Sequence, residues 1–226
     1  CVSQMKGSLT KSVAVVQPIM VPGGGTESVT AWTVEALKRE YKVTLITFSP
    51  VESDTLNRFY GTDLRDDEIS LVRPSLPPGL NKTRRFSLLK DHLMMRYCKS
   101  VAQNFDLFIA SCAMDFGRPG MQFIQMGPDS NFVQVLQGDP SFPKWYLFVK
   151  RGTVWVCRLV SRYSEQAVRQ NVYLPNSKAT GKLLEQVFGN YDYKVVYPPV
   201  ASPPSMTPWD TREEGFLCIA RIEPYK

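Results

Sequence analysis

The stretch SVAVVQPIMVPGGGTESVTAWTVEALKRE, residues 12–40, predicts a buried strand, a glycine-rich turn and an amphipathic helix in direct succession. Residues 12–17 are rich in valine, which is typical of a parallel strand covered on both faces. Pro18 and Pro22 end this strand, because proline lacks a backbone donor and fixes φ. We expect Thr26 to cap the following helix. One apolar stripe of that helix is predicted to be formed by Val29, Trp32, Ala36 and Leu37.

Three consecutive glycines, Gly23, Gly24 and Gly25, join the strand to the helix. Glycine adopts backbone conformations that side chains forbid, and it lets a ligand approach the main chain closely. The N–H groups at the start of a helix favour an anion such as a phosphate, and Glu27 adds a carboxylate to the same turn. The stretch therefore predicts either an anion-binding turn or a tight connection that binds no ligand.

Strands and helices alternate along the rest of the chain. Strands are predicted at residues 42–48, 68–72, 107–110, 121–125, 172–174 and 194–197. Helices are predicted at residues 86–103, 145–162 and 178–188, whereas residues 51–85 are otherwise irregular. This alternation predicts an α/β fold with a doubly wound parallel sheet.

The composition is that of a globular protein, with 43% hydrophobic and 12% aromatic residues in a chain of 226. No stretch is long and apolar enough to predict a membrane span. The five cysteines are scattered without a C-x-x-C pair, which predicts reduced thiols rather than disulfides or a zinc site. The net charge of +6 is compatible with lipid, nucleotide or nucleic acid and does not choose among them.

The chain is predicted to contain one domain and the beginning of another. Residues 1–11 are expected to be a polar leader and residues 12–200 the domain itself. Proline-rich residues 201–214 predict an interdomain linker. Residues 215–226, GFLCIARIEPYK, predict the first strand of a second domain that continues beyond this chain. The single histidine, His92, is expected at a surface or edge position, without a catalytic or metal-binding cluster around it.

A dinucleotide-binding motif is the first candidate for the glycine loop, but two features contradict it. Ser28 stands where the third glycine of G-x-G-x-x-G belongs, and the second predicted strand ends in TFSP without the expected acidic residue. At the other end of the chain, Arg221 follows a predicted strand and Lys226 comes five residues later. Two cations at the carboxyl end of a strand suit a diphosphate.

Four motifs in this order resemble glycosyltransferase family 4, which has the two-domain GT-B architecture. They are VPGGGTES at 21–28, YLPNSKAT at 173–180, KVVYPPV at 194–200 and ARIEPYK at 220–226. The resemblance implies a Rossmann-like acceptor-side domain and retaining transfer of a hexose from a UDP-, GDP- or ADP-sugar, without a metal or other cofactor. It also implies diphosphate contacts at Gly24, Gly25, Arg221 and Lys226, and acceptor or sugar contacts at Glu27 and Gln125.

The sequence departs from the family pattern in three ways. Ala220 replaces the first glycine of the family's G-R-x-x-x-x-K motif. Gln125 stands at or near a position where many members have a histidine, and an amide cannot carry a proton. The acidic pair of the second domain belongs beyond Lys226, so we expect this chain alone to be inactive and to bind nucleotide sugars weakly.

Aromatic and basic residues share the predicted helix at 145–162, including Trp145, Lys150, Arg151 and Trp155. One interpretation is an interfacial helix on an anionic membrane, assisted by the basic residues Lys82, Arg84 and Arg85. The other is a core helix whose cations reach solvent. The first favours a lipid-linked sugar as acceptor, and the second leaves a soluble glycan open.

The expected location is cytoplasmic, with peripheral attachment at the membrane if the first interpretation holds. A non-catalytic sugar- or nucleotide-binding module of related fold is the alternative function. Nucleic acid is not an expected partner, because the basic residues are dispersed and no nucleic-acid-binding motif is present.

Overall fold

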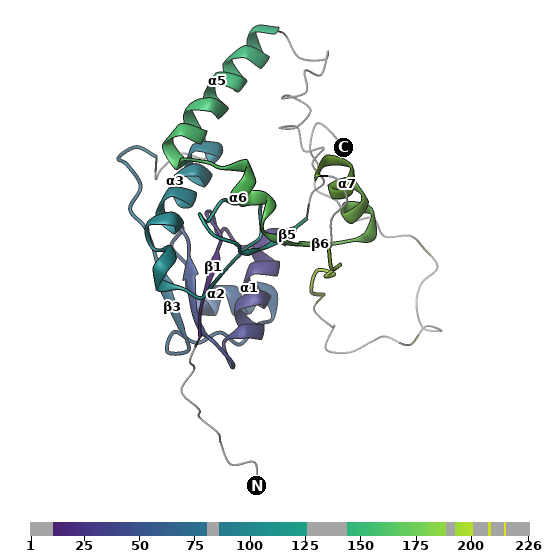
Figure 1. The fold of residues 1–226 in the computed structure, drawn as a ribbon. Helices are drawn as coiled ribbons and strands as arrows, with labels where there is room; N and C mark the ends of the chain where they lie inside the picture. The colour runs from purple at the N-terminus through teal and green to yellow at the C-terminus, as the bar shows by residue number, and fades with distance from the viewer. Residues whose placement is uncertain are drawn as a thin grey trace.

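The computed structural model describes residues 11–80, 86–125, 144–188 and 193–200, together with Pro208 and Gly215. Within these residues, six parallel strands form one sheet in the order β3-β2-β1-β4-β5-β6 (Figure 1). The strands are β1 (Ser12–Val16), β2 (Lys42–Ile46), β3 (Ile69–Val72), β4 (Leu107–Ala110), β5 (Met121–Ile124) and β6 (Val172–Pro175). The predicted α/β fold with a parallel sheet is confirmed.

Helices join the strands. They are α1 (Gly25–Leu37), α2 (Ser53–Tyr60), α3 (Ser87–Ser100), α5 (Lys144–Ser161), α6 (Glu165–Arg169) and α7 (Lys178–Phe188), with a 3₁₀ turn η1 (Ala102–Asn104) after α3. The strand order reverses between β1 and β4, which are neighbours although two strands separate them in the sequence. In open α/β sheets, this reversal is where ligands bind, at the carboxyl ends of the strands.

The core lies on both faces of the sheet, as the doubly wound prediction requires. Val13 and Val15 of β1 belong to one cluster, which also contains Ala31 of α1 and Leu56 of α2. The alternate residues Ala14 and Val16 belong to the second cluster, which contains Met94 of α3 and Phe108 of β4. Because side chains of a strand alternate between faces, the valine-rich β1 supplies apolar contacts to both layers.

Several local predictions are wrong. Helix α1 begins at Gly25 with Gly24 as its N-cap, so Thr26 is not the cap. Helix α2 occupies part of the stretch predicted to be irregular, and it ends at Gly61 with φ of +70°. Residues 194–197 are not a strand: their contact with β6 is the hydrogen bond from Val196 N to Pro175 O, 3.0 Å.

The single histidine is also misplaced by the prediction, because His92 is buried rather than at the surface. Its Nδ1 lies 2.7 Å from the hydroxyl of Ser161 at the end of α5. Burial, followed by the nearby charges of Arg158 and Lys99, lowers the pKa of His92 below its ordinary value. The imidazole is thus a neutral part of the contact between α3 and α5.

The three cysteines in the described residues, Cys98, Cys112 and Cys157, are free thiols. Burial raises the pKa of Cys98 to about 12, so it is an unreactive core side chain at neutral pH. The predicted leader, linker and second domain lie almost entirely outside the described residues and stay predictions.

Candidate functional site

The glycine loop lies at the carboxyl end of β1 and is held by helix α2. Gly23 has φ of +106°, a conformation that favours glycine, and its N–H donates to the hydroxyl of Tyr60 over 2.9 Å. Tyr60 is buried at the end of α2, and burial raises the pKa of its phenol. The neutral phenol therefore holds the loop from α2, the helix that connects β2 to β3. Strands β4 and β5 lie on the other side of β1 in the strand order.

The carboxylate of Glu27 folds back over the start of α1. A Cβ placed on Gly24 would collide with this carboxylate, so the two groups are in direct proximity. Negative charge is favoured at this position by the helix dipole. A diphosphate that approached Gly24 would meet a like charge there, whereas a sugar hydroxyl would meet a hydrogen-bond acceptor.

Gln125 approaches the same turn from the end of β5. Thr26 Oγ1 donates to Gln125 Oε1 over 3.3 Å, and Gln125 Oε1 lies 3.7 Å from the point where a Cβ on Gly25 would be. Asn176 Nδ2, from the end of β6, donates to the backbone oxygen of Gln125 over 2.8 Å. Among the described residues, the buried Nε2 of Gln125 has no hydrogen-bond partner. A buried donor without a partner is rare and is satisfied when a ligand supplies an oxygen.

Buried hydroxyl groups hold the first turn of α1 against the sheet. Thr30 Oγ1 lies 2.7 Å from Ser111 Oγ, which follows β4, and 3.0 Å from the backbone oxygen of Thr26. After β6, the hydroxyl of Ser177 accepts from the N–H of Thr180 and so caps α7. Hydrogen bonds thus connect the first turns of α1 to the carboxyl ends of β4 and β5, and the end of β5 to the end of β6.

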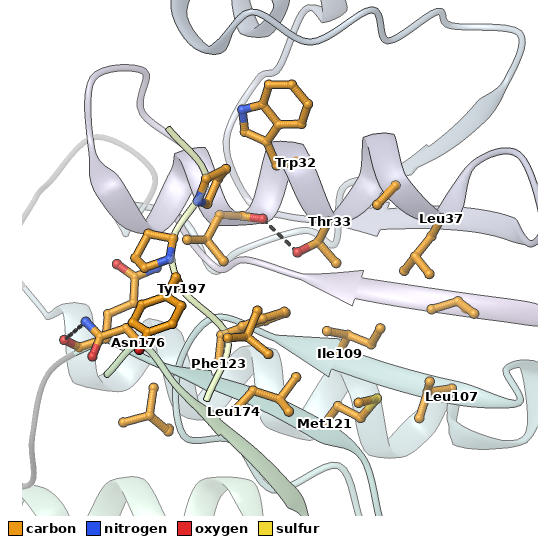
Figure 2. Close-up of a pocket in the computed structure, with 18 of the residues that line it drawn as sticks. Trp32, Thr33, Leu37, Leu107, Ile109, Met121, Phe123, Leu174, Asn176 and Tyr197 are labelled. Carbon is orange, nitrogen blue, oxygen red and sulfur yellow. Dashed lines mark hydrogen bonds between the residues drawn. The ribbon is translucent and has the colours of Figure 1, made fainter. Parts of the chain in front are cut away.

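A cavity of about 720 Å³ lies beside these contacts, between α1 and strands β4, β5 and β6 (Figure 2). Trp32 and Leu37 line it from α1, and Ile109 and Phe123 line it from the sheet. Gln125 lines the end nearest the glycine loop. The apolar stripe predicted for α1 therefore faces an open groove over these strands.

The structure brings four predicted site residues together: Gly24, Gly25, Glu27 and Gln125. Sequence reasoning missed Tyr60, Thr30 and Ser111, which position them. Gly61 directly after Tyr60 was an available helix-stop signal for α2. In the described ranges, no three His, Cys, Asp or Glu side chains are grouped closely enough to hold a metal ion.

The remaining predicted residues are either outside the described residues or on helix α5. Those outside the described residues are Arg221, Lys226, Lys82, Arg84 and Arg85, and the side chain of Lys150 is also not described. Trp145, Arg151 and Trp155 lie on α5 and are exposed. The interpretation of the two tryptophans as core residues is therefore wrong.

Comparison with known proteins gives similarity of fold only. No protein-family model matches the sequence, and no curated protein matches it. Two crystal structures are similar to this chain: Alr3699/HepE of Anabaena in complex with UDP-glucose, and a UGT transferase from Siraitia grosvenorii in complex with UDP. Both are 13% identical in sequence. The first has a TM-score of 0.44 and the second 0.45.

The chain spans about half the length of these solved proteins. The matches cover 84% and 86% of this chain but 44% and 52% of the two structures.

Proposed function

We propose that this chain is the acceptor-side domain of a glycosyltransferase that transfers a hexose from a nucleotide sugar. The observation that carries the proposal is the buried Nε2 donor of Gln125, which has no partner within the described residues and belongs to a side chain at the same glycine turn as the carboxylate of Glu27. A donor and an acceptor at one opening match the two hydrogen-bonding capacities of a sugar hydroxyl. Their position at the strand-order reversal is where an α/β sheet binds ligands.

The donor side is assigned from the resemblance to family 4. Gly24 and Gly25 are proposed to face the diphosphate, which Arg221 and Lys226 would hold. Glu27 must swing away from Gly24 when the diphosphate arrives, and its carboxylate then becomes available to the sugar. The retaining mechanism, the absence of a cofactor and the cytoplasmic location are proposed on the same ground.

The acceptor is proposed to be a lipid-linked sugar rather than a soluble glycan. The cavity beside Gln125 is lined largely by apolar side chains from α1 and the sheet. Such walls suit the apolar part of an amphipathic acceptor, while its sugar reaches the amide of Gln125. A soluble glycan would leave these walls without apolar contacts.

The binding test uses this chain and observes the side-chain amide of Gln125 by NMR during titration with UDP-, GDP- and ADP-sugars and with simple methyl glycosides. We expect the Gln125 amide resonances to shift with glycosides, and nucleotide sugars to bind near the millimolar range, about −4 kcal/mol. Micromolar binding of a nucleotide sugar would place the donor site in this domain. Unchanged Gln125 resonances with every ligand would refute the sugar site.

A transfer assay in a protein that contains both domains separates the enzyme from the non-catalytic alternative. Gly24→Val should abolish transfer, because a branched side chain blocks close approach to the loop and displaces Glu27. Ser70→Val is the control, since Ser70 is exposed on strand β3 and adds a branched side chain away from the glycine loop and α5. Sugar binding without transfer in the unmodified protein would favour the non-catalytic module.

A further inference from the structure

Helix α5 has two opposite faces that differ in burial. Cys157 and Ser161 are buried, and α3 packs against α5. Phe148, Trp155 and Leu159 follow each other at seven and four residues, which places them on one side of the helix. They are 80%, 64% and 57% exposed. The helix therefore joins the domain by one face and presents aromatic and aliphatic side chains on the other.

The buried face of α5 is fixed at its C-terminal end. Lys99 of α3 donates to the backbone oxygens of Ser161, 3.1 Å, and Arg162, 2.7 Å. These bonds satisfy carbonyl groups that the end of a helix leaves without partners. The other end of α5 extends away from the sheet (Figure 1). The C-terminal end of α5 is thereby attached to α3, with the buried side of the helix toward the domain.

The exposed face carries large apolar side chains in both halves of the helix. The large apolar side chains of α5 that are at least half exposed are Trp145, Phe148, Val149, Trp155, Val156 and Leu159. A contiguous exposed apolar surface of this kind marks an interaction site rather than ordinary protein surface.

Basic side chains lie along the edge of this face. Arg151 and Arg158 are exposed and lie seven residues apart, so they share one side of the helix. The guanidinium of Arg158 lies 4.8 Å from the centroid of the Tyr163 ring, which holds it at this edge. The sequence of α5 contains four basic residues and no Asp or Glu. The face therefore combines apolar area with positive charge.

We propose that the exposed face of α5 docks on an anionic lipid surface. A bilayer interface offers acyl chains and phosphate anions side by side, and tryptophan and arginine favour that depth. A protein partner would have to supply an acidic groove with a fully apolar floor, whereas a lipid surface supplies both features everywhere. No helix in the described residues is long and apolar enough to cross a bilayer, so α5 lies along the surface. The proposal does not depend on the sugar site.

The test measures binding of this chain to vesicles of phosphatidylcholine alone and to vesicles that also contain phosphatidylglycerol. We expect the unmodified chain to sediment with the mixed vesicles and to be released by salt. The double change Phe148→Ser with Trp155→Ser should lower the partition constant at least about tenfold. The double change Arg151→Gln with Arg158→Gln should lower it about tenfold on mixed vesicles and much less on phosphatidylcholine.

Two control variants alter equivalent residues elsewhere. Phe59→Ser removes an exposed aromatic residue of α2, and Arg39→Gln removes an exposed cation after α1. Neither should change vesicle binding. Thermal unfolding should be unchanged in all variants, and the single change Phe148→Ser replaces the double change if that variant loses its transition.

Two results would overturn the proposal. One is equal vesicle binding by the apolar double variant and the unmodified chain. The other is a dimer in sedimentation velocity that dissociates in this variant while no chain binds vesicles, which would assign the face to a second copy.

Discussion

The glycine-loop site and the contact between α3 and α5 both bury polar side chains. The two regions differ in how completely these side chains are hydrogen-bonded within the described residues. Under α5, Asp115 is fully buried and accepts from Lys99 Nζ, 2.6 Å, and from the N–H of Ser164, 2.7 Å. At the glycine loop, the buried Nε2 of Gln125 has no partner within the described residues. Buried polar groups that are fully paired stabilise a fold, whereas an unpaired donor at an opening indicates a ligand.

The largest expected effect comes from breaking the paired region. Asp115→Ala should lower the free energy of unfolding by about 3–5 kcal/mol, because it leaves the Lys99 ammonium and two N–H groups without their partner. Asp63→Ala is the control, since Asp63 pairs with Arg65 at the surface and should contribute only about 0–1 kcal/mol. Urea unfolding measures both. Equal effects would show that the buried contact is not a stabilising centre.

The same region should make stability depend on pH through Asp91. Burial raises the pKa of Asp91 from 3.8 to about 7. Between these values the folded state binds more protons than the unfolded state, so stability falls as pH rises through this window. Asp91→Asn should therefore raise the free energy of unfolding at about pH 8 by on the order of 1–3 kcal/mol, with little change at about pH 4.

The control for this prediction is the exposed variant Asp67→Asn, measured by the same urea titrations. His92 has the opposite sign, because its lowered pKa removes stability as pH falls below 6.5. In the Asp91→Asn variant, the contribution of His92 should remain visible as a loss of stability when the pH is lowered. A parallel pH profile for Asp91→Asn and the unmodified chain would contradict the raised pKa of this half-buried carboxyl group.

A smaller effect is expected at the glycine loop. Gly23→Ala should lower the free energy of unfolding by about 1–2 kcal/mol, because alanine is strained at φ of +106°. Gly24→Ala should cost less than about 1 kcal/mol, because φ of −95° suits any residue and only the flexible Glu27 carboxylate has to move. Chemical denaturation compares the two. The reverse order would show that Gly24 is required for the fold rather than for a ligand.

The smallest effect on stability is expected at the side-chain amide of Gln125, whose Nε2 has no partner in the described part of the chain. Gln125→Met retains the approximate volume and removes the buried amide, so stability should stay equal or rise by up to about 1 kcal/mol. Glycoside binding should nevertheless fall about tenfold in calorimetric titrations, whereas the exposed Gln170→Met should change neither quantity. A marked loss of stability in Gln125→Met would assign the amide to the fold.

The strands of the fold were the most predictable elements, because valine-rich runs such as β1 are buried on both faces. Helix α2, SDTLNRFY, was not predicted, because it buries only Leu56 and Tyr60 and is otherwise polar. His92 was placed wrongly because its burial depends on Ser161, which lies 69 residues away. Residues 194–197 have strand composition but make only one backbone contact with β6.

The candidate site was predictable in part. Gly24, Gly25 and Glu27 are consecutive or nearly so, and Gln125 ends a predicted strand, so the sheet edge brings them together. The groups that hold them, Tyr60 and Ser111, come from an unpredicted helix and from a loop. No local pattern in the sequence reports such long-range contacts.

The central position of β1 has a consequence for synthesis of the chain. The Gly23–Tyr60 contact spans 37 residues, whereas the Thr26–Gln125 contact spans 99. The loop can therefore form soon after Tyr60 has been synthesised. Strand β1 can pair with β4 only later, because their pairing begins next to the hydrogen bond between Ser12 and Asp106, which are 94 residues apart. Pairing over such distances is slow. The nascent chain presents an open strand edge during this interval, and we expect aggregation of the folding intermediate to begin there.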